Sequence, residues 1–276
     1  VIWGLAFVAQ RASMEHIGPF LFNAFRFIIG GSVLLPLVFL RKKKEYSQLD
    51  FKANLKGGLI AGLLLFGGAS MQQIGIVYTT AGKAGFITGL YIVFVPVFGL
   101  AFKRSTPFNV WLGALIALTG LYFLSFTEGL NVSKGDFYVL ISAFIWAFHV
   151  LIIGKFAPNG DALILSIVQF LLCGFLSLIF AILSEEIILT NILSASIPIL
   201  YGGLLSVAVA FTLQVIAQKK AHPSVAAVIL SLESVFAVLG GWLILNEIMT
   251  LRSISGCILM FAGMIIAQLK FNFNEN

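Results

Sequence analysis

The sequence predicts an all-α integral membrane protein whose ten transmembrane helices form two inverted five-helix repeats. Three observations lead to this prediction: an excess of apolar residues, ten apolar stretches separated by charged or turn-rich breaks, and an internal repeat whose equivalent loops carry opposite charge. Of the 276 residues, 60% are hydrophobic and 10% are charged, and the mean hydropathy is +1.05. Because a soluble domain carries about 25% charged residues, the surplus apolar surface is expected to face lipid.

The ten apolar stretches are the predicted membrane spans. A spanning helix needs roughly 20 apolar residues, and the breaks in the sequence place the spans at about 1–12, 19–40, 57–78, 84–102, 108–126, 136–155, 162–183, 197–218, 224–245 and 253–269. The first stretch is short and begins at Val1, so we expect the sequence to start inside that helix. Pro96 is expected to kink the span over 84–102, because proline removes a helical hydrogen bond.

An internal repeat relates the two halves of the chain. A shift of 143 positions brings residues of the first half onto similar residues of the second half, and the matched pairs are Trp3 with Trp146, Phe27 with Phe170, Gly31 with Gly174, Gly113 with Gly256, and Gly120 with Gly263. The predicted domains are therefore two five-helix repeats, residues 1–126 and 135–271, and the first helix of the first repeat is truncated at its N-terminus. The polar stretch TEGLNVSKGD joins them.

The two repeats are expected to cross the membrane in opposite directions, because five is an odd number of spans. The loop RKKK at 41–44 is equivalent to SEEI at 184–187, so equivalent loops carry opposite charge. Of the 17 Lys and Arg residues, twelve lie in even-numbered loops or at the C-terminus and four in odd-numbered loops. Positive charge is retained in cytoplasmic loops, so both termini are predicted to be cytoplasmic.

Several functional classes are excluded by what the sequence lacks. The net charge of +6 comes from short loops between spans, where it reports orientation rather than nucleic-acid binding. Cys173 and Cys257 are the two cysteines, and both fall inside spans, which leaves no disulfide framework and no metal-ligand spacing. There is no phosphate-binding G-x-x-x-x-G-K-[ST] loop and no H-E-x-x-H motif. We therefore predict neither an ATP-driven pump nor an enzyme, and no cofactor.

Inverted repeats favour a secondary transporter with its substrate held near the midplane between the halves. The expected partners are a small-molecule substrate and membrane lipid, with protons if transport is coupled to a pH gradient. An uncoupled facilitator or a channel-like pore for small polar solutes remains an alternative, as does a structural or receptor role. Substrate, transport direction, coupling and oligomeric state stay open.

Four segments carry a family resemblance: IWGLAFVAQR, KAGFITGLYIVFVPVFG, GDFYVLISAFIWAFHVLIIGKFAP and AQKKAHPSVAAVILSLESVFAVLGGWLILNEIMTLRSISGCILMFAG. They resemble the EamA branch of the drug/metabolite transporter superfamily over nearly the whole chain. Where that family tends to show Glu-Pro-Val and Gly-Glu-Arg, this sequence has Glu233-Ser234-Val235 and Asn246-Glu247-Ile248. The resemblance implies a ten-helix bundle with a central cavity that exports amino acids, amines or similar small metabolites across a bacterial inner (plasma) membrane.

Polar and aromatic residues inside spans are the candidate substrate-binding residues, because polar groups in a membrane are costly and usually face a cavity or a partner. They are Trp3, Gln10, Asn23, Arg26, Tyr91, Trp146, His149, Gln169, Gln214 and Glu233. Trp3 and Trp146 occupy equivalent repeat positions, where they suit either a cavity wall for a cationic ligand or core packing. His149, on the same helical face as Trp146, is either a proton relay or a hydrogen-bonded structural residue.

Glu233 is the one acidic residue that falls clearly in the middle of a predicted span. It follows Pro223 by ten residues, roughly 15 Å along a helix in a core of about 30 Å, so it is expected near the midplane. The groups available to face it are Arg26, Gln169, His149 and Tyr91. A static ion pair with Arg26 is one interpretation, and binding of a cationic amine or a proton is the other.

Overall fold

A computed structural model describes residues 1–40, 51–101, 106–125, 133–246 and 248–269. Within these ranges the chain is helical, with no strand. The helices are α1 (Ile2–Ser13), α2 (Pro19–Phe39), α4 (Phe51–Ile76), α5 (Ala81–Gly89), α6 (Tyr91–Ala101), α7 (Phe108–Ser125), α8 (Lys134–Phe156), α9 (Ala162–Ser184), α10 (Leu189–Ser194), α11 (Ser196–Leu200), the π-helix η1 (Tyr201–Phe211), α12 (Thr212–Gln218), α13 (Pro223–Leu230), α14 (Glu233–Leu245) and α15 (Leu251–Gln268).

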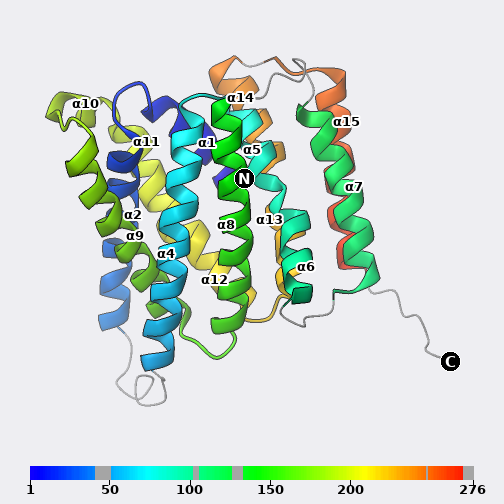
Figure 1. Cartoon of the computed structure of the whole chain (residues 1–276), viewed down its shortest axis with the longest axis horizontal. Coiled ribbons are helices and arrows are strands. Elements are labelled where there is room, and N and C mark those ends of the chain that lie inside the picture. Colours follow the sequence, from blue (N-terminus) through cyan, green and yellow to red (C-terminus); the bar gives the residue numbers. More distant parts are fainter. Residues whose placement is uncertain (41–50, 102–105, 126–132, 247, 270–276) are drawn as a thin grey trace.

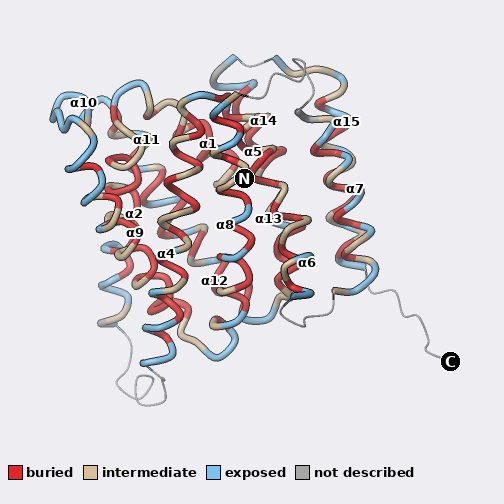
Figure 2. Tube along the Cα trace, viewed as in Figure 1, coloured by how far each residue is buried: buried red, intermediate tan, exposed pale blue. Residues whose placement is uncertain are grey.

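The long helices run side by side as a bundle, with α7 and α15 together at one end (Figure 1). In the described part of the chain, 8 continuous or joined helices are long and apolar enough to cross a membrane. The predicted spans over 1–12 and 108–126 correspond to α1 and to the shorter apolar helix Phe108–Phe123. Buried segments run through the interior of the bundle, whereas α10 and the lower ends of α2 and α4 are exposed (Figure 2). The composition and these helices describe a multi-pass membrane protein.

Two predicted spans, 84–102 and 224–245, are each built from two shorter helices that meet in the middle of the span. The first is divided at Leu90 into α5 and α6, and the second at Ser231 and Leu232 into α13 and α14. At both breaks a backbone N–H donates to the carbonyl three residues earlier. The Leu90 N–H donates to the Ile87 carbonyl, and the Ser234 N–H donates to the Ser231 carbonyl. The expected kink at Pro96 is not the break, because Pro96 lies within α6.

The two breaks pack against each other, which explains them without proline. The Ser231 hydroxyl donates to the Val228 carbonyl at 2.8 Å, a local bond that competes with regular helix geometry. The Ser234 hydroxyl donates to the Gly85 carbonyl of α5 at 2.6 Å. A Cβ at Gly89 would lie 2.7 Å from the Ser234 oxygen, so glycine permits the close approach. The crossing puts the first residues of α6 and α14, Tyr91 and Glu233, at the same place in the bundle.

Small residues join α7 to α15. A Cβ at Gly113 would lie 2.5 Å from the Gly263 carbonyl oxygen, and a Cβ at Gly120 would lie 2.6 Å from that of Gly256. Helix backbones in membranes approach this closely only where small residues meet. The same holds between α2 and α9, where Gly31 packs on Leu171 and Gly174 packs on Ile28.

The start of α2 is capped by an acid from the end of α9. Glu185 accepts hydrogen bonds from the backbone N–H groups of Phe20 at 2.7 Å and Leu21 at 2.8 Å. A Cβ at Gly18 would lie 2.2 Å from the Glu185 carboxyl carbon, so glycine makes room for the cap. A carboxylate satisfies two otherwise unpaired donors at this helix N-terminus and complements its dipole.

Replacing Glu185 by Ala is expected to destabilise the protein by about 0.5–2 kcal/mol at neutral pH, the range for a lost helix cap. Burial raises the pKa of the Glu185 carboxyl although its two backbone donors lower it. The folded protein therefore holds the proton more tightly than the unfolded chain, and this residue's contribution falls as pH rises from the ordinary carboxyl pKa toward the raised one. Thermal unfolding in detergent at several pH values measures both effects. Glu186→Ala, at an exposed neighbour, is the control, and equal midpoints for the two variants would contradict the capping role.

Candidate functional site

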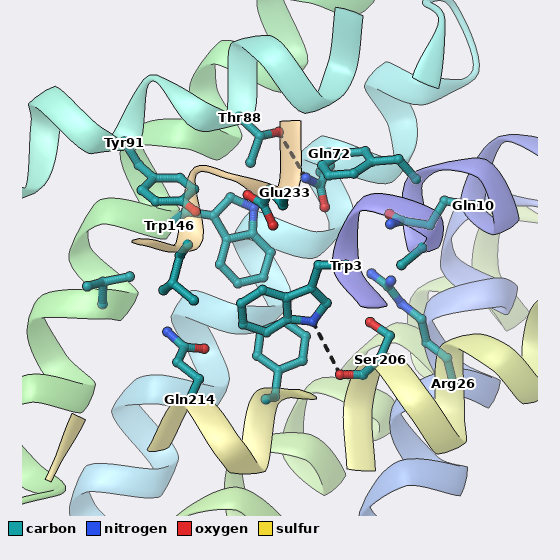
Figure 3. Close-up of a pocket in the computed structure, with 15 residues that line it drawn as sticks. Trp3, Gln10, Arg26, Gln72, Thr88, Tyr91, Trp146, Ser206, Gln214 and Glu233 are labelled. Atoms are coloured by element: carbon teal, nitrogen blue, oxygen red, sulfur yellow. Dashed lines mark hydrogen bonds between the residues drawn. The ribbon is translucent and has the colours of Figure 1, made fainter. Parts of the chain in front are cut away.

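A pocket lies in the middle of the bundle, where α1, α2, α4, α5, α6, α8, η1, α12, α13 and α14 meet (Figure 3). The empty space between its lining residues, counted together with the open space at its mouth, is about 490 Å³. Its polar and aromatic lining includes Trp3, Gln10, Arg26, Gln72, Thr88, Tyr91, Trp146, Ser206, Phe211, Gln214 and Glu233. The lining comes from both halves of the chain.

Glu233 contributes a carboxyl group to the pocket from the broken span. It is the first residue of α14, so the break brings a carboxyl group into the middle of the bundle without a long side chain. Tyr91, at the equivalent break, forms a side-chain hydrogen bond with it. Of the four groups that the sequence suggested as partners for Glu233, Tyr91 is the one that the structure brings into contact with it.

Arg26 contributes the opposite charge from α2. Its side chain is buried, and its Nε donates to the Asn23 carbonyl oxygen Oδ1 at 3.0 Å. The guanidinium lies 5.2 Å from the centre of the Phe22 ring and 4.8 Å from that of Phe27. Across the described residues, no ion pair joins Arg26 to Glu233, so the static pair considered from the sequence is not the observed arrangement.

Three aromatic side chains, Trp3, Trp146 and Phe211, form what we call the aromatic wall of the pocket. The Phe211 ring contacts both indoles, and its centre lies 4.6 Å from that of Trp3 and 5.7 Å from that of Trp146. The Trp3 Nε1 donates to the Ser206 carbonyl at 3.3 Å (Figure 3). Ser206 and Phe211 belong to η1, and π-helical segments occur frequently at functional sites. The wall offers a flat apolar surface that also attracts cations.

Several polar atoms on or beside this lining have no hydrogen-bond partner. Among the described residues they include the amide oxygens Oε1 of Gln10 and Gln214 and the Trp146 Nε1. By contrast, the Gln72 Nε2 donates to Thr88 Oγ1 at 2.9 Å. Because an unpaired buried polar atom is costly, the pocket is suited to a ligand or water that both donates and accepts hydrogen bonds.

Seven of the ten residues predicted from the sequence line the pocket, namely Trp3, Gln10, Arg26, Tyr91, Trp146, Gln214 and Glu233. Asn23, His149 and Gln169, which were also predicted to bind substrate, do not line this pocket. Asn23 holds Arg26. His149 and Gln169 are fully buried and bond to each other behind the aromatic wall.

Eight lining residues were not among the predicted substrate-binding residues: Ala6, Phe7, Gln72, Thr88, Val150, Ser206, Phe211 and Leu230. Gln72 had a signal, since it is an amide within a predicted span. Phe211 had none, because a phenylalanine in an apolar helix looks the same whether it faces lipid, core or cavity. Ser206 contributes its carbonyl to Trp3, and no side-chain pattern predicts that bond.

Comparison with known proteins identifies the class to which this bundle and pocket belong. A sequence model of the EamA-like transporter family matches residues 1–126 and 133–268. The chain belongs to the EamA-like transporter family. Its relatives within that class include a protein named an uncharacterized transporter from Archaeoglobus fulgidus, which is 34% identical over 98% of this chain and 83% of its own length. Another is the uncharacterized transporter YoaV of Bacillus subtilis, 26% identical over 99% of this chain and 94% of its own.

A solved crystal structure has the same fold as this EamA-like chain. Its TM-score is 0.72 at 19% sequence identity, and the match covers 97% of this chain and 95% of the other. Membership of the family indicates a membrane transporter rather than an enzyme, and it implies a small-molecule substrate. The pocket between the helices is the candidate place for that substrate.

Proposed function

We propose that this EamA-like protein is a secondary transporter that exports small metabolites such as amino acids or amines across the bacterial inner membrane by alternating access. The observation that carries the proposal is the joint presence, in one pocket, of Glu233, Arg26 and the aromatic wall. These groups would bind an ammonium group, a carboxylate and an apolar part, respectively.

The ammonium group would lie between Glu233 and the aromatic wall. A carboxylate attracts an ammonium strongly where water is scarce, and indole faces add attraction for the same cation. The Tyr91 hydroxyl, which already bonds Glu233, would keep the carboxyl oriented.

The substrate carboxylate would lie at Arg26. Asn23 engages the guanidinium through Nε only, and Arg26 lines the pocket, so its terminal N–H groups are placed to donate to a ligand. Guanidinium groups bind carboxylates with two parallel hydrogen bonds. An amino acid would satisfy both charged residues at once, whereas an amine would satisfy Glu233 alone.

Ten helices in two inverted repeats, over residues 1–126 and 135–271, are the proposed framework for alternating access. The contacts between α7 and α15 support a two-fold relation. At the 143-residue offset, Gly113 is equivalent to Gly256, and Gly120 is equivalent to Gly263. The contact of Gly113 with Gly263 therefore has an equivalent contact of Gly256 with Gly120, and both contacts occur. Two-fold-related halves that meet at a central site can open it to either side in turn.

The contacts between α2 and α9 support the same relation. The offset converts the contact of Gly31 with Leu171 into that of Gly174 with Ile28, and both are present. The linker between the proposed repeats lies largely outside the described residues, as does the basic loop at 41–44.

Labelling of single cysteines is expected to separate the two faces of the membrane. In a variant with Cys173 and Cys257 replaced by Ala, a cysteine at Lys43 should react with an impermeant maleimide only from the cytoplasm. A cysteine at the equivalent position Glu186 should react only from outside, because positive loops stay inside. Intact cells and inverted vesicles provide the two sides. Reaction of both cysteines from the same side would contradict the inverted repeats.

Transport by purified protein in liposomes tests the function directly. Three radiolabelled probes share one ring: L-phenylalanine carries both charges, phenethylamine the ammonium alone, and 3-phenylpropanoate the carboxylate alone. We expect saturable flux and counterflow for L-phenylalanine and phenethylamine. Flux that rises linearly with concentration, without counterflow, would instead favour the channel-like alternative. Repeating the assay with an imposed pH gradient determines whether protons are coupled.

A further inference from the structure

His149 and Gln169 form a buried polar pair directly behind the aromatic wall. The His149 Nε2 lies 2.8 Å from the Gln169 Oε1. Both side chains are completely buried, and they come from α8 and α9. Burying two polar side chains without using all of their hydrogen-bonding groups is costly, so the pair calls for a specific reason.

The hydrogen bond defines the state of the imidazole. The amide oxygen is only an acceptor, so His149 Nε2 carries the proton and donates. Among the residues that the structure describes, the other ring nitrogen, Nδ1, has no hydrogen-bond partner, and neither does the Gln169 amide nitrogen. The amide of Gln169 neither gains nor loses a proton near neutral pH, so this hydrogen bond does not connect His149 to an acid or a base. This geometry does not fit the proton-relay role that the sequence allowed.

The fixed ring contacts both second-half members of the aromatic wall. The His149 ring centre lies 5.5 Å from that of Trp146 at an interplanar angle of 87°, and 6.3 Å from that of Phe211 at 86°. Edge-to-face contacts of this kind are favourable and directional. The imidazole therefore contacts both the indole and the phenyl ring but does not itself line the pocket.

We infer that His149 and Gln169 are positioning residues: their hydrogen bond fixes the imidazole, and the imidazole holds Trp146 and Phe211 in the orientation that determines which substrates the pocket accepts. The inference rests on the proposed function in one respect, since it takes this pocket as the substrate site. It predicts that the pair affects affinity through the shape of the wall, with no contact to substrate.

The orientation of Trp146 can be measured without any substrate. Replacing Trp3, Trp111 and Trp242 by Phe leaves Trp146 as the single tryptophan. In this background, Gln169→Leu removes the acceptor while keeping a similar volume. We expect lower fluorescence anisotropy and stronger acrylamide quenching of Trp146 in detergent. Ser166→Ala is the matched control, because Ser166 is buried on the same helix one turn earlier and its hydroxyl has no partner within the described part of the chain. The control is expected to leave the fluorescence unchanged.

If Gln169→Leu does not fold, His149→Gln tests the same inference by a different change. A glutamine at this position can still donate to Gln169 but lacks the ring that contacts Trp146 and Phe211. It is expected to free Trp146 in the same way. Fluorescence equal to that of the parent protein in both variants would overturn the inference.

Transport provides a second readout in the full tryptophan background. For L-phenylalanine, Gln169→Leu is expected to raise KM by roughly two- to tenfold, the effect of one lost hydrogen bond, while kcat stays nearly constant. A fall in kcat with an unchanged KM would contradict a positioning role. Absence of flux in the wild-type protein would count against the proposed function alone, because the fluorescence result does not depend on it.

Discussion

Glu233→Gln is expected to give a folded, membrane-inserted protein that no longer transports phenethylamine or L-phenylalanine. Glutamine keeps the size of the carboxyl group and can still accept a hydrogen bond from Tyr91, but it carries no charge to pair with an ammonium. Removing one partner of a buried ion pair costs about 3–5 kcal/mol, which corresponds to about two to four orders of magnitude in affinity. Initial rates of uptake into liposomes, corrected for the amount of reconstituted protein, measure this effect.

The control for Glu233→Gln is Glu186→Gln, at an exposed acid outside the pocket. It should transport both probes as the wild-type protein does. Size-exclusion elution and thermal unfolding separate lost binding from lost folding. Wild-type flux with unchanged pH dependence in Glu233→Gln would refute both the substrate role and the proton role of this residue.

Arg26→Met is expected to reduce transport of L-phenylalanine by about ten- to a hundredfold in kcat/KM, the effect of losing a hydrogen bond to a charged group. Methionine keeps an unbranched apolar chain between Phe22 and Phe27 but offers no donor to a carboxylate. Phenethylamine has no carboxylate, so its transport should change much less. The ratio of the two rates, measured on the same liposomes, therefore reports carboxylate recognition independently of protein abundance.

Arg11→Met is the matched control, because Arg11 lies near the end of α1 and does not line the pocket. It should leave the ratio of the two rates unchanged. An equal loss of both substrates in Arg26→Met, together with a lower unfolding temperature, would assign Arg26 a structural role in holding α2.

The sequence alone determined the class of protein, and it pointed to the two charged residues, Glu233 and Arg26, that line its pocket. Apolar composition requires lipid contact, and a charge inside a span must face inward, so Glu233 and Arg26 are conspicuous in the linear sequence. The predicted repeat pairs Trp3 with Trp146, and both residues line the pocket. Such residues can be identified from the sequence because a membrane makes each buried polar residue costly and therefore rare.

The tertiary structure alone decided which residues share a face and which lie behind it. His149 and Trp146 are three positions apart on one helix, yet only Trp146 lines the pocket, whereas the imidazole bonds to Gln169 of a neighbouring helix. Phe211 completes the wall from a π-helix, and the break before Glu233 depends on Ser234 meeting Gly85. Each of these outcomes depends on contacts between residues distant in the chain, and helical periodicity along one segment carries no information about them.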